Sequence, residues 1–211
     1  MAFDQFTARL STEDELRTLL GTPGEMVMRK ELQALDAHCH KLIAHAPMVI
    51  IGTYGANGTC DVSPRGDAPG FVQILNDQTL IIPDRPGNRR FDSLRNILET
   101  GRIGLLFVIP GMEETLRLNG RACLSRDAAL LERCRAFNKL PNLVIGVEVE
   151  ECFLQCAKAF KRSQLWDTTT WPQRTELPTL AQMLHDHTRP KHQTVQDIEE
   201  DLQESYTNRI Y

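Results

Sequence analysis

Two arginine-bearing loops carry most of the chemical information in this chain. The first has the sequence DVSPRGDAPG at residues 61–70, and the second has IPDRPGNRRFDSLRN at residues 82–96. They combine arginines with short hydroxyl and amide side chains: Ser63, Arg65, Arg85, Asn88, Arg89, Arg90, Ser93 and Asn96. Guanidinium groups and small polar donors of this kind are suited to a dianionic phosphate. The two loops together therefore predict a phosphate pocket.

The first loop is stiff, because Pro64 and Pro69 each fix a backbone angle while the glycines between them permit tight turning. This stiffness would hold Arg65 in a defined direction, as ligand binding requires. The alternative is a rigid surface turn in which Arg65 only pairs with a neighbouring aspartate.

In the second loop, Pro86-Gly87 turns the chain, and Asn88 or Asp92 can start a helix. The free amides of such a helix would face an anion together with Arg89 and Arg90. The alternative is a solvated basic turn with no ligand.

A third cluster, AKAFKRSQLW at residues 157–166, joins cationic side chains to an aromatic one. Its candidate binding residues are Lys158, Arg162, Ser163 and Trp166. Cations beside an aromatic ring could clasp a planar, charged cofactor. A basic amphipathic turn with its tryptophan in the core remains the alternative.

Other chemistries find little support. The cluster of Asp36, His38, Cys39, His40 and His45 fits no tetrahedral metal-binding spacing, so we expect no metal site. The glycines of residues 52–58 do not form a GxGxxG motif, and no GxSxG motif exists. We name no catalytic residue from the sequence.

Composition narrows the class of protein. The 211 residues can bury a core of ordinary size without disulfides or a metal. The six cysteines form no CxxC pair and the N-terminus lacks a signal-peptide core, so we expect a reduced, cytoplasmic protein. A net charge of −4 argues against a general nucleic-acid binder, and the longest apolar runs are too short to cross a membrane.

The elements that must position these loops are mainly short strands. Residues 12–45 read as helical, and from Met48 onward β-rich runs alternate with turn residues such as Asn57-Gly58 and Asn119-Gly120. Without a repeated βαβ unit, this pattern predicts a mainly β (α+β) fold, a closed or split barrel of antiparallel strands. We expect one structural domain, made of a helical lead-in packed on the barrel (1–46), the barrel (47–166) and a helical C-terminal arm (167–211).

The motifs resemble a known family. DVSPRGDAPGFV, LIIPDRPGNRRFDSLRNIL, GLLFVIPGMEETLRLNG and KAFKRSQLW are similar to an uncharacterised branch of the pyridoxamine 5′-phosphate oxidase-like proteins, the FMN-binding split-barrel superfamily. The resemblance implies a homodimer with FMN at the subunit interface. It places Ser63 and Arg65 on the loop facing the flavin, Asn88, Arg89, Arg90 and Ser93 at the phosphate, and Asn96 at the ring or ribityl chain. It also implies that residues 157–166 reach across the dimer.

The function that the resemblance implies is an FMN-dependent oxidoreductase whose substrate and electron donor are unknown. In such an enzyme Lys158 or Arg162 could stabilise the anionic reduced flavin. The arginine-histidine pair near the C-terminus of the true oxidases is not recognisable here. Two alternatives stay open: a non-catalytic flavin-binding or storage protein, and a haem-binding protein on the same barrel.

Overall fold

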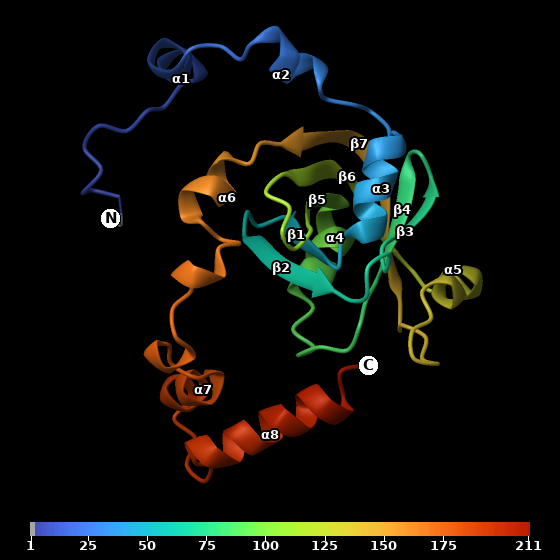
Figure 1. Ribbon diagram of the computed structural model, residues 1–211, viewed down its shortest axis with the longest axis vertical. Helices are drawn as coiled ribbons and strands as arrows, with labels where there is room; N and C mark the ends of the chain where they lie inside the picture. Colours follow the sequence, from blue (N-terminus) through green and yellow to red (C-terminus); the bar gives the residue numbers. More distant parts are fainter. Residues whose placement is uncertain (1–2) are drawn as a thin grey trace.

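A seven-stranded antiparallel sheet forms the centre of the protein in the computed structural model, which describes residues 3–211 (Figure 1). The strands are β1 (Met48–Tyr54), β2 (Cys60–Gly66), β3 (Gln73–Asn76), β4 (Thr79–Pro83), β5 (Arg102–Val108), β6 (Thr115–Ser125) and β7 (Val144–Gln155). Their order across the sheet is β2-β1-β5-β6-β7-β4-β3, so β2 and β3 are its two edges and the sheet is not closed. The expected α+β fold built on antiparallel strands is confirmed, in its open form.

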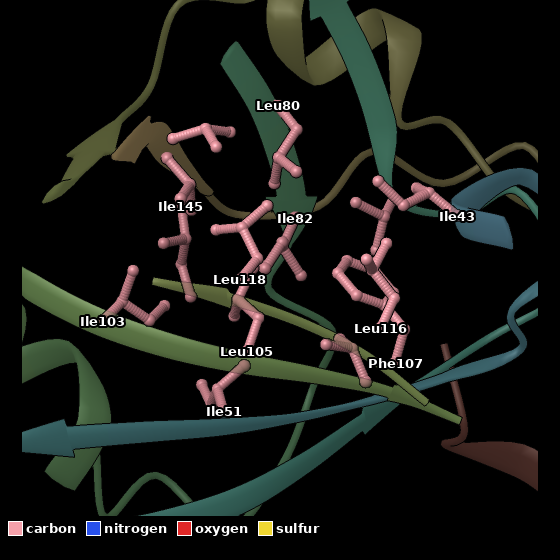
Figure 2. Packing of buried hydrophobic residues seen from close by; sticks show 14 of the residues in the cluster. Ile43, Ile51, Leu80, Ile82, Ile103, Leu105, Phe107, Leu116, Leu118 and Ile145 are labelled. Atoms are coloured by element: carbon pink, nitrogen blue, oxygen red, sulfur yellow. The ribbon is translucent and has the colours of Figure 1, made fainter. Parts of the chain in front are cut away.

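The core follows from the period-two pattern of the strands. Alternate residues of β1 and β5 are buried, which directs Ile51 of β1 and Leu105 and Phe107 of β5 to one face of the sheet. Figure 2 shows these side chains in one cluster with Leu80 and Ile82 of β4. Burial of such side chains stabilises the fold by roughly 1.5–3 kcal/mol for each one.

Helices flank the sheet. The α-helices are α1 (Glu13–Leu20), α2 (Glu25–Arg29), α3 (Ala37–His45), α4 (Asp92–Thr100), α5 (Ala128–Arg133), α6 (Lys158–Ser163), α7 (Leu180–Thr188) and α8 (Val195–Asn208). Two short 3₁₀ helices, η1 (Thr168–Thr170) and η2 (Arg174–Glu176), lie between α6 and α7. No helix within residues 3–211 is long and apolar enough to span a bilayer.

The N-terminal region divides into three helices that differ in packing. Asp36 caps α3 by accepting from the amides of His38 and Cys39, and α3 buries Cys39 and Ile43 in the core. Helices α1 and α2 bury no residue, and the arm that carries them stands apart from the sheet in Figure 1. Of the three helices in the lead-in, α3 is therefore the one that packs on the core of the sheet.

One expected turn is wrong. Asn119-Gly120 does not separate two strands but lies inside the continuous strand β6, at a shift in the register between β6 and β7. A Cβ atom on Gly120 would lie 1.9 Å from the carbonyl oxygen of Glu148. The glycine is needed for close approach of two strands at a bulge, which is a common reason for a glycine inside a strand.

Candidate functional site

A cavity of about 660 Å³ opens between the two arginine-bearing loops. Its lining comes from residues 61–67 at the edge strand β2, from residues 83–94 between β4 and α4, and from Phe71, Ile210 and Tyr211. The structure therefore brings together two loops that are separated in the sequence by β3 and most of β4. It adds a third segment, from the end of the C-terminal arm.

The cavity gathers all but one of the predicted loop residues. Its lining includes Ser63, Arg65, Arg85, Asn88, Arg89, Arg90 and Ser93. The exception is Asn96, whose buried amide donates to Thr53 Oγ1 at 3.1 Å and to Asp61 Oδ2 at 2.8 Å. In this chain Asn96 attaches α4 to the first two strands, and the expected contact with a ligand's ring or ribityl chain has no counterpart in the cavity lining.

The N-terminus of α4 points its unpaired amides at this cavity. Phe91 precedes the helix in the left-handed conformation (φ 61°) and provides no side-chain cap, and Arg89 is left-handed too (φ 60°). The amide of Arg95 makes the first helical bond, to the carbonyl of Phe91 at 2.8 Å. The amides before it are available, and the helix dipole adds positive potential there. Backbone of this kind makes a concave binding site for anions.

Two side chains beside these amides have hydrogen-bond donors that no residue of the described chain occupies. Ser93 is 4% exposed and lines the cavity, yet its hydroxyl makes no hydrogen bond to any residue of the described chain. Arg89 is exposed at the cavity and forms no ion pair within residues 3–211. Asn88 acts on the loop itself, because its side-chain oxygen accepts from the amide of Arg90 at 3.1 Å. The Ser93 hydroxyl and the Arg89 guanidinium are therefore available to an anionic ligand.

The other three cavity arginines lie beside carboxylates, and Arg90 Nε donates to Asp92 Oδ2 at 2.8 Å. Arg85 Nε lies 2.7 Å from Asp67 Oδ2, and the Asp67 side chain is only 3% exposed. Arg65 donates to Ser63 Oγ at 2.6 Å, with Asp84 at 3.9 Å. The contacts of Arg85 and Arg65 fix the directions of their guanidinium groups. Only the Nε atom of Arg85 is bound to a described side chain, so its terminal nitrogens remain available.

Burial perturbs the charges of this cluster. It raises the pKa of Asp84, against the opposing effect of Arg65, and it lowers the pKa of Arg65, against the effect of Asp84. Burial also favours the neutral form of Asp67, but hydrogen bonds from Tyr211, the Ala68 amide and Arg85 outweigh it, so the pKa of Asp67 lies below its usual value. Asp67 is therefore a carboxylate that balances the charge of Arg85.

Tyr211 is the site residue that sequence reasoning missed. Its hydroxyl donates to Asp67 Oδ1 at 2.6 Å, from a position 144 residues away along the chain. No local motif marks it, because its role depends on where the C-terminal arm returns to the sheet. Figure 1 shows the C-terminus between α8 and the sheet.

The third predicted cluster lies elsewhere in its own chain. Lys158, Arg162 and Ser163 belong to α6, and neither they nor Trp166 line the cavity. Trp166 donates through its indole N–H to the carbonyl of Met112 at 2.8 Å and stacks on Phe160, with ring centroids 5.7 Å apart. The contact with Met112 anchors the segment to the connection between β5 and β6.

Within the described chain, no group of three or more His, Cys, Asp or Glu side chains is placed to hold a metal ion. Asp36, the first residue of the histidine-rich cluster, caps α3 as described above. Cys39 of that cluster is buried beside Cys152 of β7, and its hydrogen bond to Cys152, together with burial, raises the pKa of the Cys39 thiol. These thiols pack in the core.

The chain matches one protein-family model and is similar to several solved structures. A family model described as Pyridoxamine 5′-phosphate oxidase matches residues 35–156. HupZ of Group A Streptococcus is 22% identical, with a TM-score of 0.47, over 57% of this chain and 93% of that chain. A putative pyridoxamine 5′-phosphate oxidase from Lactobacillus delbrueckii is 20% identical, with a TM-score of 0.46, over 59% of this chain and 98% of that chain. No curated protein matches the chain.

Proposed function

Because the chain belongs to the pyridoxamine 5′-phosphate oxidase family, we propose that it is an FMN-binding flavoprotein and an FMN-dependent oxidoreductase. The observation that carries the proposal is the convergence of the α4 amides, Arg89 and the Ser93 hydroxyl on one cavity. Backbone amides at a helix N-terminus, a guanidinium and a hydroxyl are the donors that a phosphate monoester accepts.

The residues present fit FMN. The cavity volume of about 660 Å³ lies inside the range of small-molecule cofactor sites, which is about 300–1,000 Å³. Arginines and backbone amides supply positive potential for the phosphate. Four aspartates also line the cavity; the pairing of Asp67, Asp84 and Asp92 with arginines reduces their repulsion of a phosphate. Phe71 and Tyr211 add aromatic surface for a planar ring system.

The division of labour follows from the geometry. When bound, a flavin supplies hydride or electron transfer. The N-terminus of α4, with Arg89, Ser93 and the terminal nitrogens of Arg90, would hold the phosphate, and Asp67 orients Arg85 toward the cavity. Ser63 supports the guanidinium of Arg65 at the edge strand. The protein thereby fixes the cofactor's position.

We also propose a homodimer in which α6 of one subunit reaches the cavity of the other. A second hollow, of about 390 Å³, lies over β1, β5 and β6 on the sheet, lined by Gly52, Gly104 and Gly120 among others. Small residues on a sheet surface allow a second subunit to approach closely. Lys158 and Arg162 would then bring positive charge to the flavin ring, which favours its anionic reduced form.

The test begins with the protein as purified. Cofactor released by denaturation should show the two-banded visible absorption of oxidised flavin and should coelute with FMN on chromatography. The holoprotein should then oxidise NADH or NADPH in the presence of an electron acceptor. Absence of flavin after purification, together with failure of the apoprotein to bind added FMN, would contradict the proposal.

A further inference from the structure

Tyr211 is held at the cavity by contacts from three separate parts of the chain. Its hydroxyl donates to Asp67 after β2, and the Arg85 guanidinium lies over its ring at 5.6 Å from the centroid. Phe137, between α5 and β7, packs against the Tyr211 ring, with the two ring centroids 4.5 Å apart. Lys139 Nζ donates to the Tyr211 main-chain oxygen at 2.6 Å. Four side chains from separate parts of the chain therefore hold Tyr211 in this position.

The seat joins Tyr211 to the arginine side of the cavity. Asp67 accepts from both Tyr211 and Arg85, one through each carboxylate oxygen. Both oxygens of this nearly buried carboxylate therefore accept hydrogen bonds, and the bond to Oδ2 fixes the orientation of Arg85 Nε. The Tyr211 hydroxyl thereby helps to set where the free terminal nitrogens of Arg85 lie, while its ring contributes aromatic surface to the cavity lining.

We propose that Tyr211 is a cofactor-contacting residue, whose ring forms one side of the cavity against the isoalloxazine ring of bound flavin. The inference rests on the proposed function, since it takes flavin as the ligand. An aromatic contact of this kind contributes up to about a tenfold change in affinity. Loss of the hydroxyl alone removes one hydrogen bond to Asp67 and leaves the ring in place.

Two substitutions and a matched control separate these contributions. Tyr211→Ala removes the ring, Tyr211→Phe removes only the hydroxyl, and Tyr206→Phe makes the same chemical change on α8, outside the cavity lining. The dissociation constant of FMN is measured by calorimetry on the full-length apoprotein, and the fluorescence of bound FMN is measured alongside. Tyrosine in contact with an excited flavin quenches it by donating an electron, whereas phenylalanine does not. Circular dichroism melting checks that each variant is folded.

We expect Tyr211→Ala to weaken FMN binding about five- to tenfold. Tyr211→Phe should keep the affinity within about threefold and should raise the fluorescence of bound FMN, while Tyr206→Phe changes neither quantity. Unchanged or tighter binding by Tyr211→Ala would overturn the inference. So would weaker binding by Tyr211→Ala with no change in fluorescence in Tyr211→Phe, because that result assigns Tyr211 a structural role only. Failure of the wild type to bind FMN would instead contradict the proposed function.

Discussion

The hydroxyl of Tyr211 donates to the carboxylate of Asp67 at 2.6 Å and so joins the C-terminal arm to the loop after β2. Asp67 at the same time lies 2.7 Å from Arg85 of the second loop. One nearly buried carboxylate therefore connects all three segments that line the cavity, and its charge state should affect both folding and binding.

Removing the charge of Asp67 should destabilise the protein in a pH-dependent way. Breaking a buried ion pair leaves the other charge uncompensated, so Asp67→Asn should cost roughly 3 kcal/mol of unfolding free energy near neutral pH. The folded-state pKa of Asp67 is lowered, so its contribution is complete above the ordinary aspartate pKa and disappears as the pH falls through the lowered value. Urea denaturation of both proteins at several pH values measures this difference.

The matched control for this experiment is Asp186→Asn on α7, where the side chain is 61% exposed. That change should alter the unfolding free energy by no more than about 0.5 kcal/mol. A difference between wild type and Asp67→Asn that stays constant from neutral pH down to the acid limit of the folded state would contradict the assigned role of Asp67.

Ser93→Ala should separate binding from stability. Ser93 lines the cavity and its hydroxyl has no hydrogen-bond partner in the described chain, so removal of the hydroxyl should leave the melting temperature unchanged or slightly higher. Loss of a hydrogen bond to a charged phosphate should weaken FMN binding about tenfold or more. Calorimetric titration measures the affinity, with Ser205→Ala on α8 as the control. Equal FMN affinity in Ser93→Ala and wild type would remove Ser93 from the phosphate site.

Gly120→Ala should disrupt the bulge between β6 and β7. The added Cβ atom would lie 1.9 Å from the main-chain oxygen of Glu148, and neither strand can move without disturbing the sheet. The expected loss of unfolding free energy is roughly 2–3 kcal/mol. Gly24→Ala is the control, since a Cβ atom there meets nothing within 4 Å. Chemical denaturation should give Gly24→Ala a clearly higher unfolding free energy than Gly120→Ala. Similar unfolding free energies of the two variants would refute the close approach of Gly120 to Glu148.

The sequence predicts much of this fold because its local signals are strong. The β-rich pattern that starts at Met48 matches β1, and the helix start expected at Asn88 or Asp92 is the start of α4 at Asp92. Asn119-Gly120 misled because the same dipeptide serves a turn or a bulge, and the choice depends on the neighbouring strand. Pairing of Asn96 with Asp61 and Thr53 likewise depends on tertiary contacts.

In the site, too, local signals could be predicted from the sequence and tertiary contacts could not. Arginines, short polar side chains and a helix start within two loops indicate an anion site directly, and the structure gathers most of them at one cavity. Tyr211 could not be found in this way, since its partner Asp67 lies 144 residues earlier. The expected reach of α6 across a dimer depends on a second subunit and stays a prediction.

The most direct test of the account compares FMN with riboflavin, which has the same ring system and ribityl chain but no phosphate. Both ligands are titrated into wild-type apoprotein, into Arg89→Ala and into Arg29→Ala, whose arginine is an exposed control on α2. We predict that wild type and Arg29→Ala bind FMN at least about a hundredfold more tightly than riboflavin, because several charge-assisted hydrogen bonds are lost with the phosphate. Arg89→Ala should lose about tenfold of that preference by weakening FMN alone. Equal affinity of the wild type for the two ligands would contradict a phosphate site at the N-terminus of α4.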